Sequence, residues 1–321
     1  MEYRKQHINN LIFSLLILFC FYGIYKIWAV IPDYSVQQTS ESPNCPEPVR
    51  DICRVNQSDA FYLYRIFLNN PKTLNEIDLM IFSDISSLLE SYGITEDQDK
   101  EFILAAASAS GCGHSILAEI IIDLYQDKPD LFKEKYGYPL YYEQDGEIIY
   151  NTETLFTDIF ARTNKDKLKD IHYDSHDMYY VMTMLGYNMY GTDIKFDDMS
   201  RYLSDVLGEN SETAAFKRNV SYKKYKEYMD RKDFDYACIG VFNFLLSPYG
   251  SNPCKNNTTT EGSGHWMRIT GVTEDGHYIV SSWGEEWEMI KGTPFVEDKK
   301  FLVFQPLSEN DGGLVFLKVN D

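Results

Sequence analysis

Positive charge is scarce in this sequence. The 321 residues include 30 Lys and Arg against 49 Asp and Glu, a formal net charge of −19. A chain this acidic repels the phosphate backbone of nucleic acids and the anionic headgroups of lipids. The charge balance therefore argues against a nucleic-acid-binding protein.

Proline is also scarce, with 11 residues, and the sequence contains no internal repeat. Hydrophobic residues make up 44% of the chain and aromatic residues 15%, including 25 Tyr and 19 Phe. This much apolar surface is enough for a packed core and excludes a wholly disordered or collagen-like chain. We expect a globular body that is rich in strands and aromatic packing.

Only one hydrophobic run has the length of a membrane span, residues 11–31, and Lys26 is its only charge. A helix of that length crosses the hydrocarbon core of a bilayer, roughly 30 Å thick. The alternatives are a cleaved signal peptide and a lipoprotein site at Cys20. The first lacks a small-x-small cleavage site near Trp28, and the second has bulky Phe19 before the cysteine, so we favour an uncleaved anchor.

The charges around this run predict its orientation. Arg4 and Lys5 precede it, whereas no Lys or Arg occurs between Ile27 and Val49. Basic flanking residues stay in the cytoplasm, so the body of the protein is expected outside it. A polar, proline-punctuated stretch follows the run. We therefore expect a cytoplasmic N-terminus (1–10), an anchor in the lipid bilayer (11–31), a stalk (32–59) and one large domain (60–321).

The hydrophobic pattern changes along this domain from a helical period to short runs rich in β-branched and aromatic residues. We expect helices over residues 74–92, 100–107, 115–126 and 177–186, and strands over 237–246, 266–272, 278–282, 301–304 and 314–319. Helices that precede strands are typical of an α+β fold.

Five cysteines lie outside the predicted anchor: Cys45, Cys53, Cys112, Cys238 and Cys254. In an oxidising compartment an odd number leaves one thiol unpaired. The pairs closest in sequence are Cys45 with Cys53 and Cys238 with Cys254, which would leave Cys112 free. Each cysteine could equally be reduced and buried.

Two segments carry groups suited to catalysis. In the first, Cys112 lies between Gly111 and Gly113, just before an apolar helix. The unpaired N–H groups and the dipole at a helix start stabilise a thiolate. In the second, His265 begins a predicted hairpin whose second strand ends near Ser281. A polar group there could orient the imidazole while its other nitrogen faces the thiolate.

These two segments resemble those of the papain-like cysteine peptidases, and most closely the bacteriocin-processing branch that cleaves after double-glycine leaders. Gly111 to Leu117 follows the Gly-Cys-Gly-Pro-Thr/Ala-Ser/Ala-Leu of that branch, with His114 at the proline position. The run from Ser282 through Trp287 is similar to the Asn-Ser-Trp-Gly-x-x-Trp run of the papain-like peptidases. The resemblance implies a papain-like fold, with Cys112 as nucleophile and His265 as general base.

The sequence departs from the family at three points. A Gln is expected six positions before the nucleophile to hold the oxyanion, but the residue there is Ala106, and Ser108 or Ser110 substitutes only in part. The Asn or Asp that follows the histidine is replaced by Ser281 or Ser282. If Cys-Gly-Ser-Cys-Trp is imposed instead, Ser115 takes the nucleophile position. We prefer Cys112, with Ser115 as a helix N-cap.

Two functions remain open. The first is a thiol hydrolase that cleaves peptide or isopeptide bonds of a peptide or protein substrate with Cys112, His265 and Ser281. The second is an inactive papain-like domain that binds a peptide or glycan through Trp266, Trp283 and Trp287. Neither function needs a cofactor or a metal. His172 and His176 resemble metal ligands but are expected on a surface loop, and His114 is expected to point to solvent.

Overall fold

A computed structural model describes residues 54–174, 177–194, 211–216, 234–249, 258–274, 277–291, 296–297, 300–301 and 313–319, together with residues 199 and 227. All of these belong to one compact unit, residues 46–321. The predicted anchor and most of the predicted stalk lie outside the described residues. In the described part of the chain, no single helix has the length and apolar composition needed to cross a bilayer.

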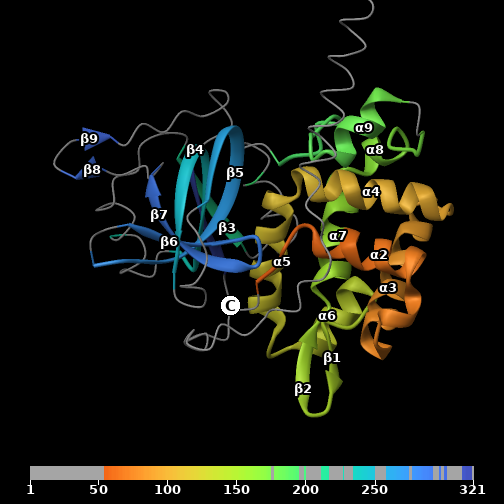
Figure 1. Ribbon diagram of the computed structural model, residues 1–321. Coiled ribbons are helices and arrows are strands. Elements are labelled where there is room, and N and C mark those ends of the chain that lie inside the picture. The colour runs from red at the N-terminus through yellow and green to blue at the C-terminus, as the bar shows by residue number, and fades with distance from the viewer. Residues whose placement is uncertain are drawn as a thin grey trace, which may run out of the picture. The chain divides into compact units, whose positions relative to one another are not determined.

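Helices dominate the first half of the described chain (Figure 1). The α-helices are α2 (Asp59–Asn69), α3 (Glu76–Ser91), α4 (Asp97–Ser110), α5 (Cys112–Tyr125), α6 (Pro129–Tyr136), α7 (Thr152–Thr163), α8 (Lys165–Leu168) and α9 (Met178–Met184), with a short 3-10 helix η1 (Pro71–Thr73). A small hairpin, β1 (Tyr141–Gln144) and β2 (Glu147–Tyr150), precedes α7.

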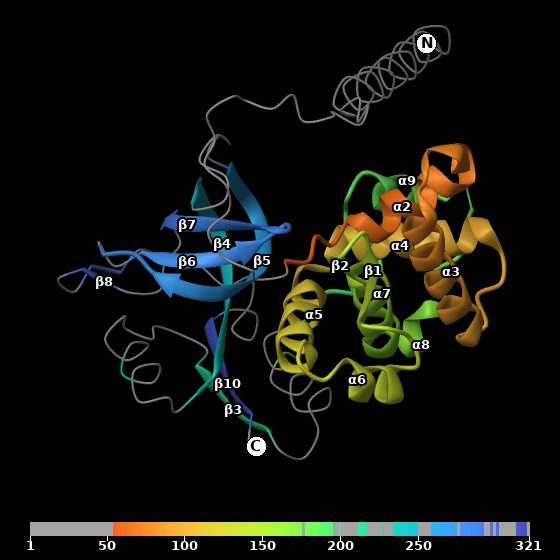
Figure 2. The same ribbon diagram turned by 90° about the horizontal axis from the view of Figure 1, so that it is seen from below.

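From residue 211 onward the elements described are strands, as the teal-to-blue arrows of Figure 2 show. They are β3 (Ser211–Phe216), β4 (Tyr236–Pro248), β5 (Thr258–Val272), β6 (Tyr278–Ser282), β7 (Glu285–Lys291), β8 (Val296–Glu297), β9 (Lys300–Phe301) and β10 (Gly313–Val319). The main sheet has the order β3-β10-β4-β5-β6-β7, with antiparallel pairings, and β4 also pairs with β7. The fold is thus α+β, as the sequence predicts.

Helix α3 illustrates why the helical half forms. Asn75 and Asp78 make a reciprocal capping box at its start, with hydrogen bonds of 2.9 and 3.0 Å between each side chain and the other's backbone N–H. Four apolar residues at a spacing of four are buried on one face: Ile77, Ile81, Ile85 and Leu89. This spacing places them on one stripe of the helix, which packs into the core. The expected helix over 74–92 is confirmed.

Helices α4 and α5 meet at Gly111, where the chain bends by 90°. A Cβ atom at this position would lie 2.5 Å from the Ala107 carbonyl oxygen and from a ring carbon of Phe156. Only glycine therefore fits the bend. Together the two helices have the length and composition of a membrane span, but most of their residues are buried in the protein core.

Two apolar clusters form on the described residues. The larger contains the inner faces of α2, α3, α4, α5 and α7 and extends to Cys238 and Trp266 of the sheet. The smaller lies among β4, β5, β6 and β7, with Met267, Val280 and Met289 fully buried. Because side chains alternate along a strand, neighbours such as Trp266 and Met267 belong to different clusters.

The start of α5 differs from expectation. The helix was expected to begin at Ser115 with that serine as N-cap, but it begins at Cys112 and its N-cap is Gly111. Ser115 lies one turn inside the helix, where its hydroxyl donates to the Gly111 carbonyl at 3.3 Å. The N-cap assignment was therefore wrong, and the correct start places Cys112 in the first turn.

Candidate active site

Helix α5 packs against β5 (Figures 1 and 2). A cavity lies at this contact. Its empty volume is about 210 Å³. It is lined by Val55, Gln57, Cys112, Ser115, Ile116, Glu119, His265, Trp266, Ser281, Ser282 and Trp283. The structure thus brings the predicted residues Cys112, His265 and Ser281 to one place, although 153 positions of sequence separate the first two.

Cys112 presents its thiol to the sheet. The Trp266 backbone N–H donates to its Sγ at 3.4 Å, and the Gly113 backbone N–H also faces the sulfur. These donors favour a thiolate, but burial of the sulfur outweighs them and raises the pKa of Cys112 to about 11. The residue keeps a partial exposure to solvent, and in this arrangement its thiol is neutral at pH 7.

His265 is held on two sides. Its Nε2 lies 2.6 Å from the Ser282 hydroxyl, and its ring stacks on Trp283 with centroids 4.6 Å apart and an interplanar angle of 22°. Burial disfavours the charged imidazolium and lowers the pKa of His265 to about 3. The imidazole is neutral at pH 7, and Ser282 and Trp283 fix its orientation.

Ser281 does not contact His265. Its hydroxyl donates to Glu119 Oε1 at 2.7 Å, and Ser282 takes the place beside the imidazole. The reason is the strand register: Arg268 pairs with Ser281, so Ser281 shares a face with Arg268 and Trp266, whereas Ser282 shares the face of His265. The sequence did not decide which of the two serines bonds His265; in the structure it is Ser282.

Glu119 lines the cavity but was not predicted as a site residue from the sequence. It lies seven positions after Cys112 and therefore on the same face of α5. Its Oε1 accepts from Ser281 and, at 3.1 Å, from the Val55 backbone N–H. Burial raises the pKa of Glu119 to about 7, against the lowering effects of Arg268 and of both hydrogen bonds. The spacing from Cys112 was the signal that could have found it.

The segment of residues 54–58, which precedes α2, forms one wall of the cavity through Val55 and Gln57. The Gln57 Nε2 donates to the Ser108 carbonyl at 2.5 Å, and the Ser58 and Ser108 hydroxyls are 2.7 Å apart. Gln57 is thus a side-chain amide in the cavity wall that comes from a different element than Ala106. It lies within residues 32–59, which were expected to form a stalk.

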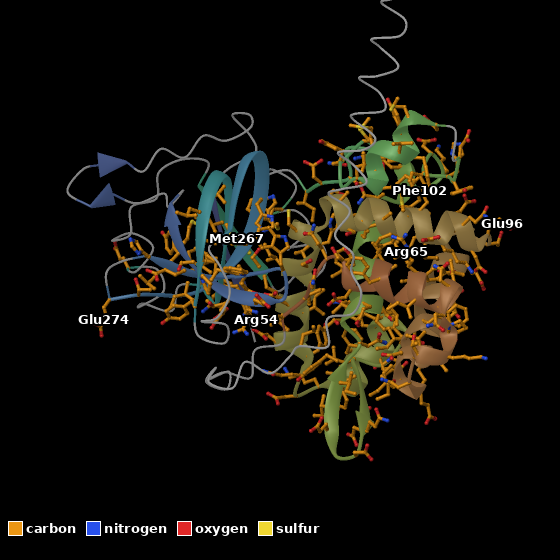
Figure 3. All side chains as sticks on the ribbon, viewed as in Figure 1. Arg54, Arg65, Glu96, Phe102, Met267 and Glu274 are labelled. Atoms are coloured by element: carbon orange, nitrogen blue, oxygen red, sulfur yellow. The ribbon has the colours of Figure 1, made fainter. Side chains whose placement is uncertain are left out.

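Buried charges surround the cavity in pairs. Arg54 bonds Glu286 of β7 at 3.1 Å, with exposed side-chain fractions of 9% and 7%. Arg268 of β5 pairs with Asp123 of α5. Figure 3 shows Arg54 and Met267 on the side of the strands, and Arg65, Glu96 and Phe102 among the helices. Ion pairs thus connect the sheet both to α5 and to residues 54–58.

The other histidines lie apart from this site. His114 was expected to point to solvent, but it is fully buried: its Nε2 is 2.9 Å from the Thr163 hydroxyl and its ring packs on Phe160. Burial lowers the pKa of His114 to about 3. His172 is exposed before α9, and His176 lies outside the described residues. No group of three or more metal-ligating side chains occurs among the residues described.

Cys238 is a free thiol buried in β4, as Cys112 is free in α5. Cys238 therefore does not form the expected disulfide with Cys254. Cys254, like Cys45 and Cys53, lies outside the described residues. Burial raises the pKa of Cys238 to about 12, so it is an inert thiol at neutral pH.

Comparisons of this chain with protein-family models, with curated proteins and with solved structures find no match.

Proposed function

We propose that this protein is a thiol hydrolase that cleaves peptide or isopeptide bonds with Cys112 and His265. One observation carries the proposal: the thiol at the start of α5 and the imidazole of β5 line the same cavity. The held ring of His265 and the N–H groups at Sγ support it, because a nucleophile needs an oriented base and donors at the reacting centre.

The reaction proceeds in two stages. The Cys112 thiol transfers its proton to His265 as Sγ attacks the substrate carbonyl, and the imidazolium then protonates the leaving amine to give a thioester. Water attacks the thioester, His265 accepts its proton, and the carboxylic acid and the free thiol are released. Backbone N–H groups at the start of α5 and the Gln57 amide are the donors available for the oxyanion.

The proposal includes a papain-like arrangement and a location outside the cytoplasm. The first is supported by a cysteine-bearing helix packed on an antiparallel sheet that carries the histidine. The second rests on the sequence, through the span predicted at 11–31 and the basic residues before it. The bilayer is then a partner of the anchor, and a peptide or protein is the substrate.

One observation favours the alternative of a binding domain without catalysis. In this arrangement the pKa values of about 11 for Cys112 and about 3 for His265 make proton transfer between them unfavourable. A hydrolase with this site must open it further before it reacts.

The test compares the full chain with two cysteine variants on a diverse peptide library, with products read by mass spectrometry. Cys112→Ala is expected to reduce cleavage by about 10³-fold or more, because the nucleophile is lost. Cys238→Ala is the matched control, since it removes a second buried free thiol away from the cavity, and it is expected to retain cleavage. Peptides that are bound but never cleaved by any form would support the binding domain instead.

A further inference from the structure

Glu119 connects three parts of the structure through one carboxyl group. It projects from α5, and its Oε1 accepts hydrogen bonds from Ser281 at the end of β6 and from the Val55 backbone N–H. Val55 itself is 2% exposed and lines the cavity beside Cys112. Whatever weakens the bond to Val55 therefore loosens the wall that residues 54–58 form.

Further contacts of residues 54–58 lie on either side of that bond. Arg54 is anchored to Glu286 of β7, and Gln57 and Ser58 are anchored to Ser108 of α4. Glu119 is thus the central attachment of the segment, directly beneath the cavity wall. Its second oxygen, Oε2, is buried and has no hydrogen-bond partner among the described residues. A buried carboxylate oxygen without a donor is costly when ionised.

We propose that Glu119 is a positioning residue that holds residues 54–58 against the cavity and thereby controls access to Cys112. This deepens the proposed hydrolase function, because it states how the closed site would open. It does not depend on turnover, since access to a thiol can be measured whether or not the protein cleaves a substrate.

The charges around Glu119 set the direction of its pH response. Arg268 of β5 favours the carboxylate and Asp123 of α5 disfavours it, while Cys238 of β4 stays neutral. The other two titratable cavity residues, Cys112 and His265, also stay neutral between pH 6 and 8. Of the three titratable side chains in the cavity wall, Glu119 is the one whose charge changes in this range.

Proton linkage determines whether opening is favoured at low or at high pH. In the closed state the pKa of Glu119 is about 7, and in an opened, solvated state it returns toward its ordinary 4.5. The proton therefore binds more tightly to the closed state, so closure is favoured at low pH and opening is favoured as the pH rises through about 7. For these two values the opening equilibrium increases about tenfold between pH 6 and 8.

The first experiment measures iodoacetamide labelling of Cys112 in the full chain, with the Cys112 peptide quantified by mass spectrometry. Rates are divided by those of a free thiol at each pH to remove intrinsic thiolate ionisation. The wild type is expected to show a residual rise of about tenfold between pH 6 and 8. Glu119→Gln preserves the shape of the side chain but cannot ionise, and it is expected to abolish that rise and to label slowly throughout.

Two further variants test whether this effect on Cys112 labelling comes from Glu119 itself. Asp123→Asn is the matched control, because it neutralises a carboxylate one turn further along α5. Asp123 pairs with Arg268. The hydrogen bonds described for Ser281 and Val55 go to Glu119 and not to Asp123. This control variant is expected to retain the rise. Arg54→Gln removes a second anchor of the segment, its ion pair with Glu286, and is expected to label several times faster at pH 6. If Asp123→Asn behaves like Glu119→Gln, general electrostatics and not this attachment governs access, and the proposal fails.

A second experiment reports on the segment without using Cys112. Trypsin cleaves after Arg54, and its rate there, normalised to a synthetic substrate at each pH, measures release of residues 54–58. Cleavage is expected to be faster at pH 8 than at pH 6 in the wild type, and independent of pH in Glu119→Gln. Equal profiles in the two proteins would overturn the role of Glu119. This experiment does not use the reaction of Cys112 with peptides. Its result therefore tests the role of Glu119 separately from the proposed hydrolase activity.

Discussion

The interior of the helical region and the contact between α5 and the sheet are both buried, but they are built from different residues. Around α3 the buried positions are aliphatic, such as Ile81, Ile85 and Leu89. At the contact of α5 with the sheet the buried positions include His265, Arg268, Ser281, Ser282 and Glu119. The helical region buries single polar groups elsewhere, such as Lys100 and Asp158, but the buried face of α3 is apolar, whereas the α5 contact gathers several groups that prefer to be hydrated.

This difference separates what stabilises the protein from what can react. Apolar burial contributes about 25 cal/mol per Å² and needs no partner, whereas each buried polar group costs free energy unless a hydrogen bond compensates it. The paired charges and hydrogen bonds at α5 meet that requirement for most of the groups. A polar interior of this kind indicates a site, and the predictions below test whether the two regions are separable.

The largest effect is expected from Ile85→Ala, which removes three carbon atoms from a fully buried position in α3. The loss of apolar burial and the cavity left behind should lower the free energy of unfolding by about 2–5 kcal/mol. Urea titration measures this, with Leu79→Ala as control because Leu79 is 41% exposed on the same helix. Cys112 labelling in the folded variant should be unchanged; a large change would mean that the two regions are coupled.

The second effect concerns stability and pH. The pKa of Glu119 is raised from its ordinary 4.5 to about 7, so its contribution to stability is fully present below pH 4.5 and is lost as the pH rises through about 7. Glu119→Gln should therefore gain stability relative to the wild type between pH 5 and 8, by up to about 3 kcal/mol. Urea titrations of both proteins at the two pH values give this difference. A constant difference would show that Glu119 is not buried as described.

The smallest effect distinguishes the two adjacent serines. Ser282→Ala removes a neutral hydrogen bond to His265, worth about 0.5–1.5 kcal/mol, and should reduce a histidine-dependent reaction of Cys112 about threefold to tenfold. Ser281→Ala leaves that bond in place and should instead alter the pH response that depends on Glu119. Alkylation rates of the two variants across pH 6 to 8 separate these effects. Identical profiles would argue against the separate roles of the two hydroxyls.

Much of the fold could be predicted because periodicity reports burial directly. The helix over 74–92, the strand over 278–282 and the α+β order are all present. Helix α2 begins at Asp59, where the expected stalk ends, and was not predicted. Strand β7 was not predicted either, although Trp287 and Met289 alternate with glutamates as in a half-buried strand, because the run from Ser282 was interpreted through its resemblance to a family motif.

The sequence indicated which residues meet at the cavity but not the strand register there. Cys112 and His265 could be found because glycines and a helix start are local signals. The sequence could not show that Ser282 and not Ser281 bonds the histidine, because a shift of one residue in strand pairing moves each side chain to the other face of the sheet. The shift between Ile269 and Gly271 in the β5–β6 ladder is set by the folded sheet.

The pairing of β5 has a consequence for how a substrate would be recognised. At Arg268 and Ile269 β5 pairs with both β4 and β6, whereas in the described ladders His265 and Trp266, which line the cavity, pair with β4 alone. On the side away from β4, the Trp266 N–H donates to the Cys112 sulfur and not to another strand. The main chain of β5 at the cavity is therefore directed at the thiol, so the backbone as well as side chains such as Trp283 would take part in recognition.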